Sequence, residues 1–600
     1  MKIFTVALAA LAFSACHLQA ATLDHHPHWS SEKLPDLYYE VLSRSLDQAL
    51  ELQAPDGRYR TAMPAVSDPD ESGWRVTWMQ FIYAPALLYH TDNPANRYRG
   101  SRQALESAIR AGDYLAGIVE ADGSVLPRVN GKPTNPLDAH RTMYCWTEAY
   151  ALLKPHLDSG RAARWAGALR RAGELIAAEE VFPRINRPKY TSPFLGFSPN
   201  HLGLRATTVW RMGMVLDIPE WVEKVQPALK RFVNHIRPGG YWEEHNGPTM
   251  SYDYLNVSVA GLLWHYSSEP DAMRAMRLNT DFHTHWTTPD GIDIHTVDQR
   301  NRSHFSPRAS YGLFAFSHFP HGRRYARFRL LTALGDGDEP LQAMGLESLA
   351  RIAQDAYYHV DGVETTIPQQ EHSYRHTLDR PAVACKKGSW VYSMSALVGP
   401  ERPLSQFYLD RIVPVSLWHA KTAHIIGGGN SKRQPELATF AVHRADGEWS
   451  YLPLDALIAG SREADTMCVA HEGFSLRFTF DIEDDTRAVV RAQAEFTYDR
   501  PDTAYLHLPL VLHAGGTLEA GAGRSFTLSA RRLDLSGVGE LSHNGWHASL
   551  PPAARLRWPY YTYSPYGDVR VPENIHNALG VLAVPLKNDG EWVEISFSVD

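Results

Sequence analysis

The chain has 600 residues, which is too long for one hydrophobic core of the usual size, so two or more domains are expected. Its 59 Lys and Arg residues and 67 Asp and Glu residues give a net charge of −8, which argues against nucleic acid as a partner. The chain is rich in Trp, Tyr and His, with 16, 28 and 29 copies, and this suits either the binding of sugar rings or a large aromatic core.

The first 20 residues have the pattern of an export signal. Lys2 supplies the positive charge, Phe4 to Ala15 form a short apolar run, and small residues follow, so cleavage is expected after Ala20. The apolar run is too short to cross a bilayer, so no membrane span is predicted. Cys16 could also end a lipoprotein signal, but Phe13 stands where Leu is usual, and lipidation is the less favoured alternative. We therefore expect a periplasmic or secreted protein.

From about Leu34 to about Tyr358 the sequence reads as consecutive helices separated by Pro, Gly, Asn and Asp residues. Helical periodicity is present in Leu37–Leu52, Trp74–Tyr89, Ser101–Val119, Arg141–Leu153 and Ala162–Ala178, and in the segments after Asn200, Asp217, Ser251, Pro307, Arg323 and Leu341. Many helices with short connections predict helical hairpins that close into a toroid, or an α-solenoid. Because no fixed sequence period is visible, we predict a toroid over 21–362.

One amphipathic helix separates two short polar motifs. Asp217 is expected to cap this helix, Pro219 lies in its first turn, and Pro227 falls at a position where the helix could kink. The Asn200-His201 pair starts the helical segment before it, and Tyr252-Asp253-Tyr254 starts the one after it. A helix that runs out and back can bring the two motifs together in space.

After about Val363 the hydrophobic period changes from that of helices to that of strands. Phe474 to Ile482 and Val593 to Val599 alternate apolar and polar residues, and Tyr505 to His513 and Phe526 to Leu535 add further strands. The pattern predicts an antiparallel β domain over 363–600, arranged as a sandwich. Only three cysteines remain after the signal, Cys145, Cys385 and Cys468, and they predict neither a disulfide framework nor a metal site.

Three short motifs, together with the order of helices and strands, match the pattern of a known group of proteins. The motifs are Asn200-His201 before a helix, Gly240-Tyr241-Trp242-Glu243, and Ser251-Tyr252-Asp253-Tyr254, with a weaker match from Thr288 to Arg300. In this arrangement the chain resembles the heparinase II/III-like and alginate-lyase-like polysaccharide lyases. The resemblance implies an (α/α) toroid joined to a β-sandwich, and cleavage of a uronate-containing polysaccharide by β-elimination.

The chain departs from the pattern of these lyases at two places. Pro199 stands where many relatives have a second Asn, and an insertion from His245 to Met250 precedes Ser251. Because of the insertion, either of two tyrosines could correspond to the catalytic one. Alignment of the Ser-Tyr-x-Tyr motif favours Tyr252, and Tyr254 is the second candidate.

The resemblance implies a role for each residue of the motifs. β-Elimination removes a proton beside a charged carboxylate, so that carboxylate must be neutralised, and Asn200 is implied as its donor, helped by Arg205. Asn200 would also suit a helix cap. His201 is the candidate base, with an ordinary pKa near 6.5, and a structural histidine is the alternative. Tyr252, with Tyr254 in reserve, is the candidate acid for the leaving oxygen and could serve as both acid and base; packing in a helix is its alternative.

Further side chains are implied to bind substrate. They are Trp242, Glu244, Arg300, Arg302, His304, His419 and His424. A solvated loop would explain the arginines equally well, and an ordinary β-hairpin would explain the last two histidines. The His140-Arg141 pair at a helix start could face a sugar channel, or belong to the core or the surface.

No cofactor or catalytic metal is predicted. His283 and His285 beside Asp281, and the pair His318 and His321, lack the ligand set of a known zinc motif. Some relatives carry a structural zinc or calcium ion, so an ion of this kind would fit the resemblance without being required.

We therefore predict a polysaccharide lyase that leaves a 4,5-unsaturated uronate end. Alginate, glucuronan and glycosaminoglycan-like chains all fit as substrates, and no particular oligomeric state is predicted. One alternative is a glycoside hydrolase on the same toroid, which needs two carboxylates such as Glu243, Glu244 or Asp253. The other alternative is a non-catalytic periplasmic glycan-binding protein. Fold alone does not separate these functions, and the Asn-His-Tyr set favours the lyase.

Overall fold

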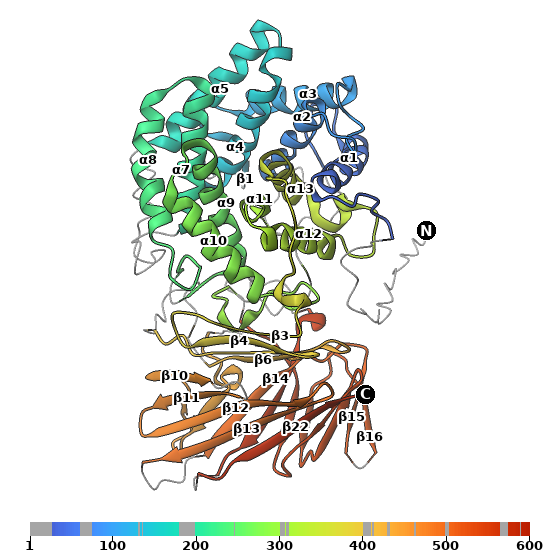
Figure 1. Cartoon of the computed structure of the whole chain (residues 1–600), viewed down its shortest axis with the longest axis vertical. Helices are drawn as coiled ribbons and strands as arrows, with labels where there is room; N and C mark the ends of the chain where they lie inside the picture. The colour runs from blue at the N-terminus through green and yellow to red at the C-terminus, as the bar shows by residue number, and fades with distance from the viewer. Residues whose placement is uncertain are drawn as a thin grey trace, which may run out of the picture.

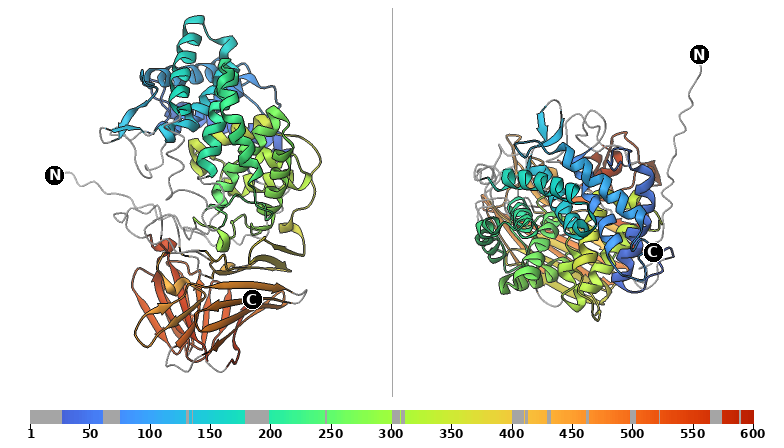
Figure 2. Two further views of the ribbon diagram at one scale, coloured as in Figure 1. Left: turned by 90° about the vertical axis from the view of Figure 1, so that its left-hand side faces the viewer. Right: turned by 90° about the horizontal axis from the view of Figure 1, so that it is seen from above.

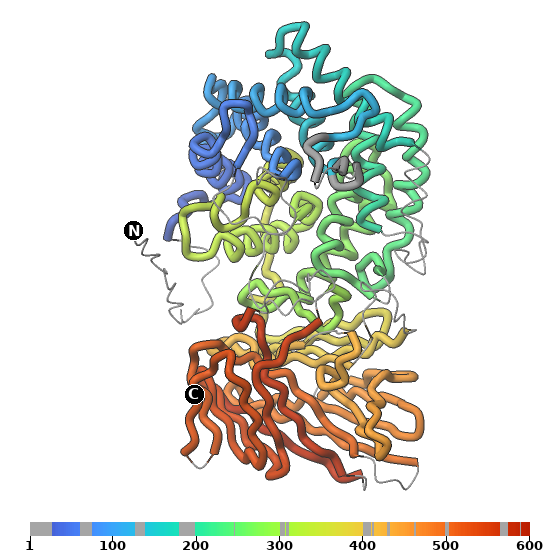
Figure 3. The backbone as a smooth tube through the Cα atoms, turned by 180° about the vertical axis from the view of Figure 1, so that it is seen from behind, coloured from blue at the N-terminus to red at the C-terminus, as the bar shows by residue number. Residues whose placement is uncertain are grey.

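The computed structural model describes 27–60, 75–129, 132–134, 136–178, 199–244, 247–300, 307, 311–399, 410, 413–428, 432–460, 464–497, 503–521, 523–563, 574–587 and 590–600. The expected signal segment, Arg302 and His304 lie outside these residues. The described chain forms a helical region stacked on a β region, as Figures 1 and 3 show from opposite sides.

The helical region carries one small hairpin, β1 (Val125–Val129) with β2 (Lys132–Thr134), which the sequence did not predict. Its helices are α1 (Leu34–Leu52), η1 (Val76–Ile82), α2 (Tyr83–His90), α3 (Arg102–Ile118), α4 (Pro136–Leu153), η2 (Lys154–His156), α5 (Ser159–Ala177), α7 (Pro199–Leu216), α8 (Pro219–Asn234), α9 (Met250–Ser267), α10 (Pro270–His285), η4 (His295–Val297), α11 (Leu313–Phe316), α12 (Pro320–Leu334) and α13 (Pro340–Tyr358). Helix α10 was not among the expected helices, and the segment expected as one helix up to Tyr89 is split into η1 and α2.

These helices form two concentric rings within the described part of the chain (Figure 2). The inner ring consists of α2, α4, α7, α9, α11 and α13, each in contact with the next, and α13 closes it against α2 and η1. The outer ring consists of α1, α3, α5, α8, α10 and α12. Because inner and outer helices alternate along the chain, successive inner helices run in the same direction. The toroid predicted from the sequence is confirmed.

The connection between α7 and α8 differs from its expected form. Asp217 does not cap α8 but takes a left-handed conformation, with φ of 57°. The N–H of Ile218 then donates to the carbonyl of Gly213 at 2.8 Å, which closes the end of α7 in the manner of a Schellman turn. Pro219 begins α8 as expected, and α8 continues through Pro227 to Asn234. This turn sends α8 back along α7.

The β region consists of two antiparallel sheets. The first has the order β10 (Asp455–Gly460), β11 (Asp465–His471), β12 (Phe474–Asp484), β13 (Arg487–Phe496), β22 (Val593–Val599), β19 (Trp546–Ser549), β18 (Glu540–His543), β15 (Thr517–Ala520) and β16 (Arg524–Thr527). The second has the order β17 (Leu533–Ser536), β20 (Arg555–Tyr560), β21 (Leu579–Pro585), β14 (Thr503–Leu510), β7 (Ala423–Ile426), β6 (Val415–His419), β5 (Trp390–Ser395), β4 (Ala382–Lys387) and β3 (Ser373–Thr377), with β8 (Phe440–His443) and β9 (Trp449–Ser450) beside β14. Three 3₁₀ turns accompany them, η5 (Pro368–Gln370), η6 (Pro435–Leu437) and η7 (Ile575–Asn577).

The predicted alternation along β12 explains why the two sheets pack face to face. Phe474, Leu476, Phe478 and Phe480 are buried between the sheets, and Ser475 on the other face is exposed. An alternating strand buries one face and leaves the other to solvent. The antiparallel sandwich predicted from the sequence is confirmed.

An apolar cluster joins the toroid to the sandwich. Its members are Tyr241, Met250, Phe282, Trp286, Ile294, Val297, Tyr374, Leu378, Ala382, Ala384, Val391, Leu397 and Trp418. Polar contacts surround it: Trp418 Nε1 donates to Asp290 Oδ2 at 3.0 Å, and Thr296 Oγ1 lies 2.9 Å from Ser393 Oγ. The sandwich therefore fixes the segment from Trp286 to Val297 against the end of the inner ring.

Gly240 sets the path of the segment that leads to α9. Its φ is +87°, and a Cβ atom there would lie 2.2 Å from the carbonyl oxygen of Leu278. Both facts exclude a side chain, because the left-handed conformation strains L-residues and backbone atoms cannot give way. Glycine at this position therefore allows 241–244 to lie close to α10.

We expect Gly240→Ala to destabilise the toroid by about 2 kcal/mol or more, since it adds a backbone clash to conformational strain. Gly100→Ala is the matched control, because Gly100 also has a positive φ, of +64°, but has nothing within 4 Å of its Cβ position. The control should cost about 1 kcal/mol. Thermal unfolding followed by helical circular dichroism measures both. Equal losses in the two variants would contradict a role for the close approach to Leu278.

Candidate active site

The two sequence motifs lie in the first turns of neighbouring inner helices. Helix α7 begins at Pro199, so Asn200 and His201 belong to its first turn, and α9 begins at Met250, so Tyr252 belongs to its first turn. Because α7 and α9 are in contact and run in the same direction, these turns lie at the same end of the ring. That end faces the sandwich, since Met250 belongs to the cluster between the two regions.

Asn200 is not in the usual capping position. The helix begins one residue earlier, and the cap residue precedes the first helical residue. Asn200 is 5% exposed, and Arg205, one turn further along α7, is 1% exposed. The amide and this guanidinium are therefore held by the protein interior next to the end of the ring.

Arg300 is tied to the segment before α9. Its Nη2 lies 3.2 Å from Glu244 Oε1, and its backbone N–H donates to Asp298 Oδ1 at 2.8 Å. The N–H of Gln299 donates to the carbonyl of Pro248 at 2.9 Å. Sequence analysis treated Glu244 and Arg300 as separate substrate-binding candidates, whereas the structure brings them together as an ion pair.

The charges of Arg205 and Arg300 both act on the pKa of His201. Its side chain is exposed, yet the surrounding protein, with the charges of Arg205 and Arg300, lowers its pKa from 6.5 to about 4. The ring is an uncharged base at neutral pH, because a group with this pKa is protonated only in acid. His201 thus lies within reach of the two positive charges that could hold an anion.

Two buried carboxyl groups support this arrangement. Asp253 Oδ1 accepts the N–H of Trp242 at 2.9 Å, and burial raises the pKa of Asp253 well above its usual value. Burial also raises the pKa of Asp298 to about 6, although the N–H groups of Arg300 and Met250 donate to it. Asp298 was recognised in the sequence only as part of a turn, because nothing in its local pattern reveals burial.

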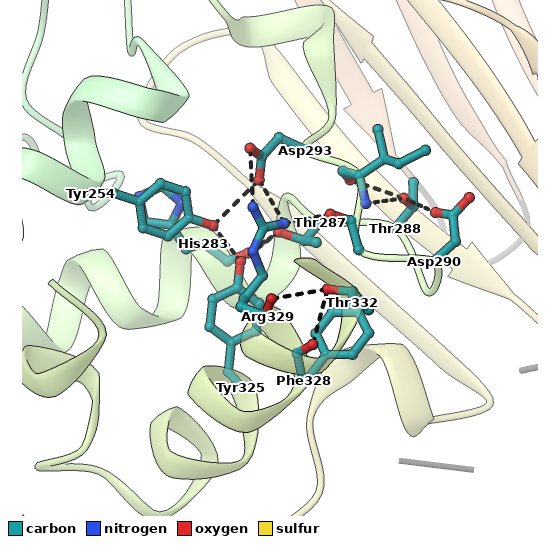
Figure 4. Close-up of polar contacts among 12 residues, drawn as sticks. Tyr254, His283, Thr287, Thr288, Asp290, Asp293, Tyr325, Phe328, Arg329 and Thr332 are labelled. Atoms are coloured by element: carbon teal, nitrogen blue, oxygen red, sulfur yellow. Dashed lines mark hydrogen bonds and ion pairs between the residues drawn. The ribbon is translucent and has the colours of Figure 1, made fainter. Parts of the chain in front are cut away.

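The two candidate tyrosines differ in their surroundings, and Figure 4 shows those of Tyr254. Tyr254 is 2% exposed, its hydroxyl lies 2.6 Å from that of Tyr325 and 3.3 Å from Asp293 Oδ1, and its ring is stacked on His283 at 3.8 Å. Burial raises its pKa well above 10. Tyr252 is partly exposed. The geometry therefore favours Tyr252 as the tyrosine that meets a substrate.

The network around Tyr254 is closed by a buried ion pair. Arg329 Nη1 lies 3.2 Å from Asp293 Oδ1, and its guanidinium lies 5.4 Å from the ring centroid of Tyr254. Thr287 Oγ1 lies 2.7 Å from the Tyr325 hydroxyl. These contacts join α9, α10 and α12 and give the network a structural role.

Two expected substrate-binding residues occupy other places, and the structure corrects those expectations. Trp242 is 1% exposed, donates to the carbonyl of Phe232 at 2.9 Å and stacks on the Phe232 ring, so it has no face open to a sugar. His419 is 1% exposed, and its Nε2 lies 2.9 Å from the carbonyl of Asp485 inside the sandwich.

His424 lies where the two regions meet. It is 3% exposed. Burial lowers the pKa of His424, and the charge of Asp290 opposes this shift only in part. Asp290 belongs to the turn at the start of the weaker sequence match. His424 is therefore placed beside the toroid, as the resemblance implied, although in a buried position.

The acidic residues considered for a hydrolase are already engaged. Glu243 Oε1 lies 2.7 Å from Arg380 Nη1, Glu244 pairs with Arg300, and Asp253 is fully buried. Arg380 comes from the loop before β4, and sequence analysis did not identify it because a single arginine in a turn carries no local pattern. This arrangement gives no support to a carboxylate pair open to solvent.

Within the described ranges, no group of three or more His, Cys, Asp and Glu side chains is arranged to hold a metal ion. The helices of these same ranges are all too short or too polar to cross a membrane.

Comparisons with known proteins concern the fold. No family model matches the sequence, and no curated protein is similar to it in sequence. A xanthan lyase from Paenibacillus aligns with 94% of this chain and 57% of its own, at 10% identity and a TM-score of 0.50. A heparan sulfate lyase from Pedobacter heparinus (93% and 82%, 12% identity, TM-score 0.45) and a chondroitin AC lyase from Streptomyces coelicolor (95% and 80%, 11% identity, TM-score 0.47) are also similar.

These likenesses have a defined scope. The chain spans little more than half the length of the xanthan lyase, and at 10% identity that match shows the fold alone. The toroid-plus-sandwich fold that the sequence resemblance implied is thereby confirmed, and the chemistry rests on the site itself.

We expect Arg300→Gln to raise the pKa of His201 above 4, because one of the two nearby positive charges is removed. The value should stay below 6.5, since desolvation of the ring by the surrounding protein is the largest cause of the shift and remains. Nuclear magnetic resonance of histidine labelled with carbon-13, assigned with His201→Ala, measures the titration. Arg102→Gln is the control, because the Arg102 side chain is 89% exposed. An unchanged titration in Arg300→Gln would place Arg300 too far from His201 to matter.

Proposed function

We propose that this protein is a polysaccharide lyase that cleaves a uronate-containing chain by β-elimination. The observation that carries the proposal is that Asn200-His201 and Tyr252 lie in the first turns of two parallel inner helices that are in contact. The charge of Arg300, which pairs with Glu244, acts on His201. The fold shared with a xanthan lyase is compatible with this activity. The proposal includes export from the cytoplasm, through the signal segment expected at the N-terminus.

The uronate carboxylate is bound by Asn200, Arg205 and Arg300. Removing the proton at C5 places charge on this carboxylate, and donors fixed in advance stabilise that charge most where water is excluded. Both arginines are at least nine-tenths buried, which strengthens their attraction for an anion. The first turns of α7 and α9 add the positive ends of two helix dipoles.

His201 takes the C5 proton. Its ring is uncharged at neutral pH, and a bound carboxylate offsets the two positive charges that lower its pKa, so the ring becomes a stronger base when substrate arrives. The electron pair of the broken C5–H bond forms the C4–C5 double bond, and the C4–O bond breaks. Tyr252 donates its proton to the leaving oxygen. In a second version of the mechanism Tyr252 performs both proton transfers.

Replacing Tyr252 with Phe should lower kcat by about a hundredfold or more, because a general acid in the transition state is lost. The assay follows the ultraviolet absorbance of the new double bond on alginate, glucuronan and glycosaminoglycans. Tyr254→Phe should keep most of the activity, and Tyr357→Phe is the surface control, since Tyr357 is 40% exposed.

The reverse result, with Tyr254→Phe inactive and Tyr252→Phe active, would identify Tyr254 as the acid. New reducing ends without ultraviolet absorbance would show that the enzyme is a hydrolase and not a lyase. Binding of one polymer without any cleavage would favour a glycan-binding protein.

When the pH is lowered, kcat/KM should fall with a midpoint near pH 4, well below 6.5. This parameter reports the free enzyme, in which His201 loses its proton near pH 4 and is the active, unprotonated base at every higher pH. His201→Ala should remove most of the activity. His245→Ala is the matched variant, because His245 directly follows Glu244 in the sequence. A midpoint at pH 6.5 or above, or loss of activity only in His245→Ala, would contradict His201 as the base.

A further inference from the structure

A cavity lies at the centre of the inner ring, one helical turn beyond His201 and Tyr252. The space between its lining residues is about 510 Å³ when the open solvent at its mouth is included, and the centre of a water molecule can occupy about 40 Å³ of it. Leu204 of α7 and Leu255 of α9 line it, and each follows His201 or Tyr252 by three residues, which is ~4.5 Å along a helix. The cavity therefore lies directly beyond the candidate active site, towards the middle of the toroid.

Two guanidinium groups share this cavity. Arg141 of α4 and Arg351 of α13 both line it, and their guanidinium carbons lie 5.7 Å and 3.3 Å from the ring centroid of Tyr311. An aromatic face attracts a cation but carries no net charge to neutralise it. Burial lowers the pKa of both arginines, and the charge of Arg141 lowers that of Arg351 further. The cavity thus holds two like charges in a poorly solvated place.

Carboxylates of the described residues balance this charge only in part. Glu347 Oε2 lies 3.9 Å from Arg351 Nη2, a long contact, while Glu347 Oε1 accepts the hydroxyl of Thr77 at 2.6 Å. Asp355 is also near, but its carboxyl accepts the N–H of Phe314 at 3.0 Å, and burial raises its pKa well above the usual value. The other carboxylate oxygen of Asp355 accepts no hydrogen bond from the described residues, so neither carboxylate satisfies the donors of Arg351.

Arg351 has donors that the described protein does not satisfy. The residue is 8% exposed, and its Nε and Nη1 are buried without a hydrogen-bond partner among the described residues. The neighbouring groups are neutral: burial raises the pKa of the Cys145 thiol to about 12, and the amide of Gln354 donates to the hydroxyl of Tyr144 at 2.9 Å. Buried guanidinium donors are stable only with acceptors, so this set of groups fits an anion and not a cation.

We propose that the centre of the inner ring is an anion subsite of the substrate cleft, where Arg141 and Arg351 bind the carboxylate or sulfate group of the sugar residue next to the one that reacts. The inference rests on the proposed lyase function and names a second acidic residue in its substrate. A planar guanidinium matches a carboxylate or sulfate through two parallel hydrogen bonds. The apolar walls, which include Leu204, Leu255 and Leu262, accommodate the carbon faces of the sugar ring.

The first experiment tests the anion site without catalysis. Thermal unfolding of the full-length protein is measured with sodium sulfate and with sodium chloride at equal ionic strength. Sulfate stabilises folded proteins in general more than chloride does, because it is excluded from their surfaces. The rise in Tm with sulfate over chloride should therefore be larger in the wild type than in Arg351→Met, and the excess reports binding at this site. Thr207→Val is the matched control, since Thr207 lines the same cavity but its hydroxyl already donates to the carbonyl of Gly203 at 2.7 Å; it should keep the response.

Each variant is compared with its own Tm in chloride, so that a change in its intrinsic stability does not enter the result. A rise in Tm with sulfate that is as large in Arg351→Met as in the wild type would overturn the site.

The second experiment separates a sugar from a free inorganic anion. On the polymer that the wild type cleaves, Arg351→Met should raise KM about tenfold or more, which is the loss of one charge-assisted contact, and leave kcat nearly unchanged. Arg351-dependent sulfate binding with an unchanged KM would overturn the sugar subsite. If the wild type cleaves no polymer, the lyase proposal fails, and the anion subsite is tested by calorimetry with acidic oligosaccharides. Binding that is lost in Arg351→Met supports the subsite. Binding that this substitution does not affect overturns the subsite.

Discussion

The alternation of inner and outer helices is the constraint on which the site depends. A chain that passes outward through α8 must return, so α7 and α9 run in the same direction and present their first turns at the same end of the ring. The positive dipole ends of both helices are then directed towards the same space. Asn200, His201 and Tyr252 need no long-range match in sequence to meet, because the hairpin topology brings their positions together.

The sandwich is part of this site and not an appendage. Its strands β5 and β6 hold 286–297 through the apolar cluster and through the contacts of Thr296 with Ser393 and Ser395. This segment leads directly to Asp298 and Arg300, and Arg380 from the sandwich pairs with Glu243 on the other side. A guanidinium near His201 is thus positioned by contacts that span both regions.

Much of the fold could be predicted from the sequence, because hydrophobic period alone separates helices from strands. The first half has the period of helices and the second half alternates, as in β12, and both patterns record which face each element buries. The period failed for α10, whose polar sequence gives a weak pattern. The prediction that Asp217 caps α8 was wrong. Aspartate favours helix caps but also tolerates the left-handed conformation, and the path of the chain decides which of the two it adopts.

The site was less predictable, for physical reasons that differ from residue to residue. Tyr252 and Tyr254 are two positions apart on one helix and point in different directions, so composition could not tell which one meets the open end of the ring. Trp242 lies in an irregular segment, where no period reveals the buried face. Arg351 resembles an ordinary surface residue of α13 in sequence, and its burial follows only from the closure of the ring.

The proposed binding of an acidic polymer by a chain with a negative net charge requires positive charge to be concentrated locally. The net charge of −8 describes the whole surface, whereas Arg205, Arg300, Arg141 and Arg351 concentrate positive charge along the inside of the ring, where low-dielectric walls strengthen its field. Desolvation of the ring, followed by the charges of Arg205 and Arg300, keeps His201 a weak base while the cleft contains no anion. In the proposed mechanism the carboxylate of the substrate reverses this effect, because it offsets the charges that lower the pKa of His201. Binding and activation of the base then have one electrostatic cause.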